Sequence, residues 1–232
     1  MKSPAGFLKK LLGRGRPGPR QSPTDNPGLG LRAGLSIQGL FDALHERKAS
    51  YVVLRWFDGL PHGDPEGDID MLVADRDMAA IADLFEHNPE AVQCDVFSVS
   101  GLPGSRYRGM PYLPPEKAAP VLTRATLFKG TCMVPSPEDH FLTLAYHTIY
   151  QKGLRSGLPT SQPGMAPKAA PGHDYAGTLR TLAQAAGIDV EISLEGLDRY
   201  LQERGWRPSS EVISKLAMHN IWLAARIGQS PA

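Results

Sequence analysis

Two kinds of hydrophobic spacing alternate along the first half of the chain. Apolar residues recur every three or four positions after Ser36 and again after Asp77, as in amphipathic helices. Around the second of these helices lie three apolar runs, rich in β-branched and aromatic side chains, at 51–56, 68–73 and 92–99. Such runs are typical of strands in a buried sheet. The pattern therefore predicts helix, strand, strand, helix and strand, the second helix ending at Asn88-Pro89.

The second half of the chain has mainly helical spacing. Extended structure is expected within 121–134, with Lys129-Gly130 at a turn. Ser136 and Pro137 then begin a helix, because a serine hydroxyl accepts from first-turn amides and proline fits the first helical position. This helix is expected to end near Lys152-Gly153. Three further helical stretches are predicted at about 174–186, 193–204 and 210–227.

These elements predict an α+β fold in three parts. Residues 1–34 are rich in Gly, Pro and Arg and predict a disordered basic tail. Residues 35–135 predict a small mixed sheet with flanking helices, although the Gly- and Pro-rich stretch 101–120 gives no clear element. Residues 136–232 predict a helical region, interrupted by a flexible spacer at 156–173 that is rich in small residues and proline.

Charge separates the tail from the body. The chain has 232 residues, 41% of them hydrophobic, and a formal net charge of +1. Residues 1–34 carry seven basic residues and one acidic residue, so their net charge is +6 and that of the remainder is −5. An acidic body argues against broad nucleic-acid binding, which needs clustered Lys and Arg. Residues 6–12 could form a short basic amphipathic helix that contacts a membrane or a partner protein weakly, but a solvated tail is favoured.

The two cysteines bear on the compartment. Cys94 and Cys132 both stand in apolar, strand-like runs and are interpreted as small buried hydrophobic residues. Two such cysteines favour a reducing compartment. No apolar run reaches the length of a membrane span, and no signal-peptide pattern is present. The expectation is a cytoplasmic protein.

The candidate chemistry lies in the stretch Gly67-Asp68-Ile69-Asp70-Met71-Leu72-Val73. Because strand side chains alternate, Asp68 and Asp70 share one face. Two ionised carboxylates in one layer repel each other unless a cation lies between them, and Mg²⁺ with substrate phosphates is the usual partner. A third acid, Asp95, stands in the next strand among apolar and neutral residues. The alternative interpretation is a hairpin strand with a solvated polar edge.

This order of elements, with Asp-x-Asp opening one strand and a single Asp in the next, resembles the nucleotidyltransferase superfamily over residues 36–100. DNA polymerase β, poly(A) polymerases and the minimal bacterial nucleotidyltransferases share that fold. The resemblance implies that Asp68, Asp70 and Asp95 hold two Mg²⁺ (or Mn²⁺) ions over the triphosphate of an NTP. It further implies transfer of a nucleoside monophosphate to a hydroxyl acceptor, with Asp95 drawing the acceptor proton. The wording Tyr-His-x-x-Tyr-x-Lys-Gly at 146–153 is also similar to uncharacterised bacterial nucleotidyltransferase-like proteins.

Basic residues near these acids have two interpretations each. Lys152 and Arg155 could contact the β- and γ-phosphates, or Lys152 could complement the C-terminal dipole of its own helix. Arg55 could contact substrate or neutralise the acids. The family pattern has one departure here, since Trp56-Phe57 stands where the first strand normally ends in Gly-Ser. Gly and Ser let backbone amides approach phosphates closely, and Trp does not.

Two other functions stay open. The Trp56-Phe57 replacement is compatible with a catalytically inactive nucleotidyltransferase-like domain that serves as a binding module. A glycosyltransferase that holds a nucleotide-sugar through Asp-x-Asp and Mn²⁺ is ranked lower, because few ordered residues precede Asp68. His140 and His147 lie seven residues apart, on one helical face, without an evident third ligand. They are interpreted as packing or surface histidines rather than a zinc site.

Overall fold

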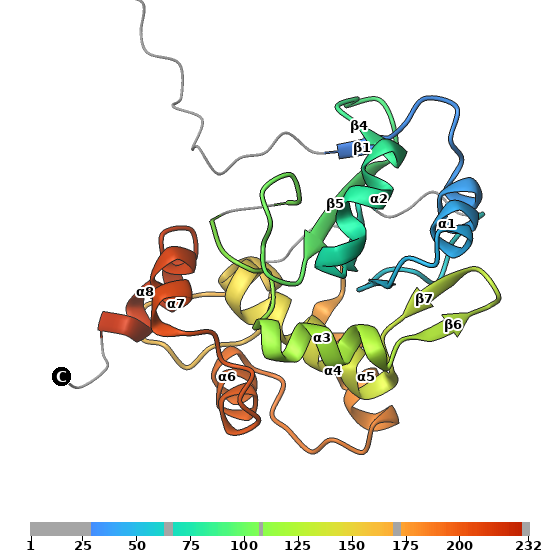
Figure 1. Cartoon of the computed structure of the whole chain (residues 1–232). Coiled ribbons are helices and arrows are strands. Elements are labelled where there is room, and N and C mark those ends of the chain that lie inside the picture. Colours follow the sequence, from blue (N-terminus) through green and yellow to red (C-terminus); the bar gives the residue numbers. More distant parts are fainter. Residues whose placement is uncertain (1–28, 63–66, 107–108, 169–172, 229–232) are drawn as a thin grey trace, which may run out of the picture.

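The computed structural model describes residues 29–62, 67–106, 109–168 and 173–228, and it has a mixed α+β fold. A five-stranded sheet lies between two groups of helices (Figure 1). Its strands occur in the order β2 (Tyr51–Val53), β3 (Ile69–Val73), β5 (Gln93–Ser98), β1 (Leu29–Leu31) and β4 (Phe85–Glu86). Strands β3 and β5 are parallel, and every other neighbouring pair in this sheet is antiparallel. The expectation of a small mixed sheet is confirmed.

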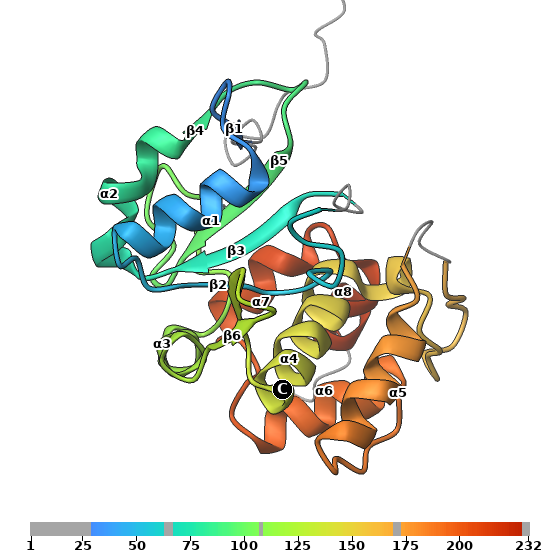
Figure 2. The same ribbon diagram turned by 90° about the vertical axis from the view of Figure 1, so that its right-hand side faces the viewer.

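The two faces of this sheet contribute to separate hydrophobic cores. Val53, Met71 and Val96 pack on the side of α1 (Ile37–Glu46). Their neighbours in the strands, among them Leu72 and Phe97, pack against the larger group of helices. Figure 2 shows α1 on one side of β3 and helices α4 and α5 on the other. The alternation therefore directs every second residue of β3 and β5 towards the helical region.

The prediction of one continuous helix from Asp77 to Asn88-Pro89 is wrong. This segment consists of the 3₁₀ turn η1 (Asp75–Asp77), the four-residue α2 (Met78–Ile81) and the 3₁₀ turn η2 (Ala82–Leu84), and then enters β4. The Asp77 carboxylate accepts from the Ser50 amide at 2.9 Å and makes no cap hydrogen bond. Phe85 pairs with Leu31 of β1. Tertiary pairing thus overrides the helical spacing of this stretch.

The helical region covers the other side of the sheet (Figure 2). The Ser136 hydroxyl accepts from the Asp139 amide at 3.3 Å, as the sequence predicts, and α4 then runs into the π-helical turn η3. The helix expected over 210–227 is divided, because Asn220 begins a new helix by accepting from the Leu223 amide. The elements of this region are α3 (Pro115–Thr123), α4 (Pro137–Tyr146), η3 (His147–Lys152), η4 (Gly153–Ser156), α5 (Tyr175–Ala185), α6 (Leu194–Glu203), α7 (Ser210–Ala217) and α8 (Ile221–Gly228).

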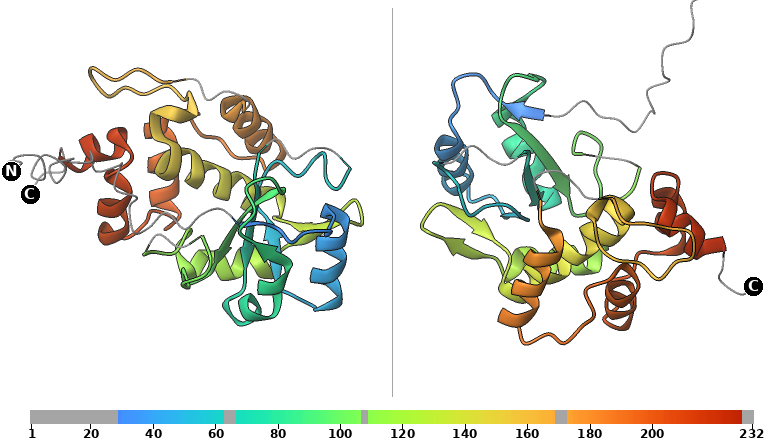
Figure 3. Two further views of the ribbon diagram at one scale, coloured as in Figure 1. Left: turned by 90° about the horizontal axis from the view of Figure 1, so that it is seen from above. Right: turned by 180° about the vertical axis from the view of Figure 1, so that it is seen from behind.

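Extended structure also forms a separate hairpin. Strands β6 (Thr126–Phe128) and β7 (Cys132–Val134) pair antiparallel, and Lys129 and Gly130 in their connection both have positive φ. The predicted turn at Lys129-Gly130 is therefore confirmed. The Met133 amide donates to the Tyr51 hydroxyl at 3.3 Å, which fixes the hairpin beside β2 (Figure 3).

The tail boundary and the flexible spacer expected from sequence are both partly wrong, whereas the expected burial of the cysteines is confirmed. Residues 29–31, placed in the tail, form β1, whereas residues 1–28 lie outside the described residues. Within the expected spacer, Leu158 is buried and the Thr160 hydroxyl donates to Glu195 at 2.6 Å. Cys94 and Cys132 are buried free thiols, as expected. Among the described helices, none is long and apolar enough to cross a membrane.

Candidate functional site

Two of the predicted acids lie side by side on the parallel strands β3 and β5. Asp70 is the register partner of Asp95, and the next matched pair on the same face is Leu72 with Phe97. Asp68 precedes β3 and is exposed. The glycine ahead of it, Gly67, has φ 109°, a conformation that side chains rarely adopt. Strand alternation therefore brings Asp70 and Asp95 to the sheet face that meets the helical region.

A cavity of about 360 Å³ lies where this face meets the helices. All three predicted acids line it, together with four basic residues and a group of aromatic and imidazole rings. The basic residues are Arg55, Arg106, Lys152 and Arg155, and the rings include Trp56, Tyr112, His147, His173 and Tyr175. The structure thus brings every predicted site residue into one cavity, in which cations, carboxylates and ring faces are available to a ligand.

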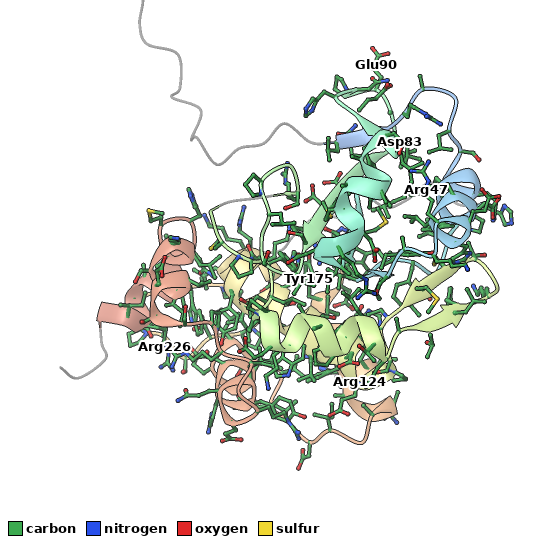
Figure 4. The ribbon with its side chains drawn as sticks, in the orientation of Figure 1. Arg47, Asp83, Glu90, Arg124, Tyr175 and Arg226 are labelled. Atoms are coloured by element: carbon green, nitrogen blue, oxygen red, sulfur yellow. The ribbon has the colours of Figure 1, made fainter. Side chains whose placement is uncertain are left out.

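Arg55 and Asp70 form a buried ion pair at the floor of this cavity. Nη2 of Arg55 lies 2.6 Å from Oδ1 of Asp70, and the two side chains are 6% and 8% exposed. Nη1 of Arg55 donates to the Tyr112 hydroxyl at 2.8 Å. That hydroxyl lies 2.7 Å from Nδ1 of His147, and the Tyr175 hydroxyl lies 3.4 Å from Nε2. A chain of polar contacts therefore runs from the Asp70 carboxylate to Tyr175, which lies near the middle of the molecule (Figure 4).

Burial shifts the pKa values of several cavity residues. Desolvation raises the pKa of Asp70 to about 6, although the Arg55 guanidinium opposes the rise. Desolvation also lowers the pKa of Lys152, and nearby Arg55 and Arg155 add to this effect. For His147 desolvation and the charge of Arg55 hold the pKa well below its usual range, so the imidazole is neutral. A neutral imidazole accepts the hydrogen bond that Tyr112 offers.

Asp95 has a partner of a different kind. Nε of Arg106 lies 3.1 Å from Oδ1 of Asp95, and these side chains are 27% and 18% exposed. The Arg106 amide donates to the Val96 carbonyl, so the connection after β5 returns along that strand. The Arg106–Asp95 pair is less buried than the Arg55–Asp70 pair, although Nε of Arg106 is itself out of reach of water.

Lys152 and Arg155 approach the cavity from the end of the long helical segment that begins at Pro137. Lys152 is the last residue of η3, and Arg155 follows in η4. Gly153, between them, has φ 54°, and an added Cβ would lie 2.2 Å from Oδ1 of Asn220. Only glycine allows this close turn. Lys152 is partly buried and Arg155 is exposed, so Lys152 has the more desolvated charge of the two.

Trp56 occupies the position where the resemblance expects glycine, and its backbone has a glycine-like conformation with φ 56°. Its ring lies in the cavity and stacks on His173, whereas the Phe57 ring turns to the opposite core and packs edge-on against Phe128. Residue 56 thus combines a backbone conformation typical of glycine with a large aromatic side chain.

The acids suit one divalent ion better than two. Among the described residues, no three His, Cys, Asp or Glu side chains are grouped closely enough to hold a metal ion. One oxygen of Asp70 is already bound to Arg55. Mg²⁺, however, is usually held by one or two carboxylates plus phosphate oxygens of the substrate. Asp68 and Asp95 both line the cavity and supply two such carboxylates. The residues therefore fit a single ion that arrives with a phosphate ligand.

Comparisons with protein-family models, with curated proteins and with solved structures find no match for this chain. The assignment of the site therefore depends on its own geometry.

Sequence reasoning missed several cavity residues. Arg106 and Tyr112 lie in the stretch 101–120, where no element was expected, and Tyr175 begins a separate helix. His147 is buried in the cavity, and no zinc-binding group includes it among the described residues. His140 packs on the Phe57 ring with centroids 4.9 Å apart. The motif Tyr-His-x-x-Tyr-x-Lys-Gly at 146–153 contains both His147 and Lys152, and it was the sequence signal that could have placed His147 in the site.

Proposed function

We propose that this protein is a metal-dependent nucleotidyltransferase that moves a nucleoside monophosphate from an NTP to a hydroxyl acceptor. The observation that carries the proposal is the register pair Asp70 and Asp95, which faces Lys152 across one cavity. Carboxylates opposite cations suit a ligand that brings both a divalent ion and phosphates. The partly buried Trp56 ring, which lines the cavity, supplies stacking surface for a base or for the acceptor.

Each cavity side chain has its own role in the proposed transfer. Lys152 and Arg155 bind the β- and γ-phosphates and stabilise the charge that develops on the departing pyrophosphate. The acceptor oxygen forms a bond to the α-phosphorus while the bond to the bridging oxygen breaks, and the acceptor proton passes to the Asp95 carboxylate. Asp68 and Asp95 would hold the divalent ion, which would polarise the phosphate oxygens. The Asp70–Arg55 ion pair fixes the position of β3 beside the cavity.

A second candidate is a nucleotide-binding module without transferase activity. Two observations favour it, since Arg55 and Arg106 each pair with one of the acids, and Trp56 fills the place of the phosphate-facing glycine. Both candidates predict nucleotide binding at the same cavity. Only the transferase predicts a product that carries the label of an α-labelled NTP.

The test is a thermal-shift screen of the four NTPs with Mg²⁺ or Mn²⁺, followed by labelling. At a hundredfold excess over its dissociation constant, a ligand adds about 2.7 kcal/mol of stability. Each kcal/mol raises the melting temperature by roughly 2–4 °C at this chain length. Asp95→Asn should abolish the shift, and Glu90→Gln, beyond β4 at the far end of the sheet (Figure 4), should keep it. An unchanged shift in Asp95→Asn contradicts the site. Binding without a labelled product favours the module.

A further inference from the structure

Arg55 is held in place from both ends of its guanidinium group. One terminal nitrogen pairs with Asp70 at 2.6 Å and the other donates to the Tyr112 hydroxyl at 2.8 Å. The side chain is 6% exposed, and its charge lies 5.7 Å from the centre of the Tyr112 ring. A guanidinium group does not lose its proton in proteins. The positive charge of Arg55 beside Asp70 is therefore permanent.

The hydrogen bonds behind Arg55 have only one consistent direction. A guanidinium group donates and cannot accept, so the Tyr112 hydroxyl accepts from Arg55 and directs its own hydrogen to Nδ1 of His147. Nε2 of His147 then carries the imidazole hydrogen and faces the Tyr175 hydroxyl at 3.4 Å. All three aromatic partners are buried. Moving Arg55 away from Asp70 would break this chain, so the guanidinium is fixed.

Arg106 is the opposite case. Nε of Arg106 lies 3.1 Å from Oδ1 of Asp95, and the Arg106 side chain is 27% exposed. The Arg55 and Asp70 side chains are only 6% and 8% exposed, so water screens the charges of the Arg106–Asp95 pair more than theirs. A divalent ion that arrives with phosphates can therefore take the place of Arg106 at Asp95. It cannot take the place of Arg55 at Asp70.

We infer that Arg55 is a built-in cation of the site, so that nucleotide binds with one divalent ion, at Asp95 and Asp68, instead of two. This inference rests on the proposed function. Arg55 occupies Oδ1 of Asp70 and neutralises the carboxylate as a fixed part of the protein, so Asp70 offers little attraction to a second ion. Arg106 is released from Asp95 when the ion binds, and this guanidinium, which also lines the cavity, becomes available to the phosphates.

The test counts bound Mn²⁺ by electron paramagnetic resonance with the full chain. Mn²⁺ is titrated to saturation in the presence of each NTP as its α,β-methylene analogue, which binds without reacting. One Mn²⁺ per chain with bound analogue supports the inference. Two overturn it while leaving the proposed function standing, and the absence of both Mn²⁺ and analogue binding overturns both.

A second experiment uses Mn²⁺ alone and tests which arginine the ion displaces from its carboxylate. Arg106→Gln should tighten Mn²⁺ binding by roughly three- to tenfold, because Asp95 loses a competing cation. Arg76→Gln, a matched change at a side chain that is 77% exposed, should leave the affinity unchanged. Arg55→Lys, which keeps the charge beside Asp70, should keep the stoichiometry at one. Equal affinity of Arg106→Gln and wild type overturns the assignment of the ion to Asp95.

Discussion

Trp56 stacks on His173 with ring centroids 4.4 Å apart and ring planes inclined by only 9°. The stack joins the segment after β2 to the residue that leads into α5, and Tyr175 meets the Trp56 ring edge-on at 5.6 Å. It holds Trp56 at a left-handed φ of 56° that a bulky side chain normally avoids. The stacking and the strained backbone therefore act against each other at one residue.

This opposition predicts that glycine at position 56 is more stable than alanine, the reverse of the usual order of stability. Trp56→Ala loses the stack and keeps the strain, whereas Trp56→Gly loses the stack and removes the strain. Left-handed backbone costs roughly 1–2 kcal/mol for a residue with a Cβ. Trp56→Gly should therefore be more stable than Trp56→Ala by about 1 kcal/mol in urea unfolding, although glycine destabilises most other positions. Equal stability, or a more stable alanine variant, would show that position 56 is not strained.

The two acids of the register pair should respond differently to loss of charge. Asp70→Asn leaves the Arg55 guanidinium buried without its counter-ion, and breaking a buried pair in this way costs about 3–5 kcal/mol. The Asp95 and Arg106 side chains are less buried, at 18% and 27% exposed, so Asp95→Asn should cost less, on the order of 1 kcal/mol. Urea unfolding of both variants measures the difference. Similar losses for the two would mean that the Arg55–Asp70 pair is not desolvated. For this reason Asp95→Asn is the better variant for binding studies.

The partly buried His140 predicts acid sensitivity. Burial lowers the pKa of His140 to about 4, so the folded protein favours the neutral ring. The unfolded chain binds a proton below about pH 6.5, and the contribution of His140 to stability is therefore present above that pH and lost as the pH falls towards 4. At pH 5 the loss is roughly 2 kcal/mol. His140→Gln should flatten the dependence of the unfolding free energy between pH 7 and pH 5 by that amount.

The control for this prediction is His87→Gln, at an exposed position in the loop after β4. This change removes an imidazole without altering the packing around His140, so the variant should keep the wild-type pH dependence. His147, whose pKa is also lowered by burial, is unchanged in both variants. Parallel pH profiles for His140→Gln and wild type would contradict the assignment.

How much of the fold the sequence could predict depends on where each element obtains its stability. Helix α1 has its own cap and apolar stripe, so local pattern suffices. Strand β1 does not, because Leu29, Gly30 and Leu31 are too few and carry a central glycine. Strand β1 forms because of contacts with residues distant in sequence. An added Cβ on Gly30, for example, would lie 2.6 Å from the Asn88 carbonyl oxygen. A strand made by such close approach leaves no periodic signal.

The candidate site divides in the same way. Strand alternation predicts that Asp68 and Asp70 share a face, and the match of Asp70 with Asp95 follows once β3 and β5 are neighbours. Arg106 and Tyr112 reach the same cavity from irregular chain, where spacing has no meaning. Their places are set by single contacts, such as the hydrogen bond from Arg55 to Tyr112. Such contacts join residues far apart in sequence and cannot be inferred from either neighbourhood alone.

The two basic residues after α4 should contribute unequally to nucleotide binding. Charge-assisted hydrogen bonds contribute roughly 1.5–3 kcal/mol where water is excluded, so Lys152→Gln should weaken NTP binding about tenfold or more. Arg155 is exposed and screened, and Arg155→Gln should weaken binding only about two- to fivefold. Raising the salt concentration should reduce the effect of Arg155→Gln more than that of Lys152→Gln, because buried charges are screened less. Isothermal titration calorimetry at low and high salt measures both, with Lys48→Gln as the exposed control. If Lys152→Gln and Lys48→Gln bind equally well, the phosphates do not lie at the end of η3, and the orientation of the nucleotide in the cavity must be reversed.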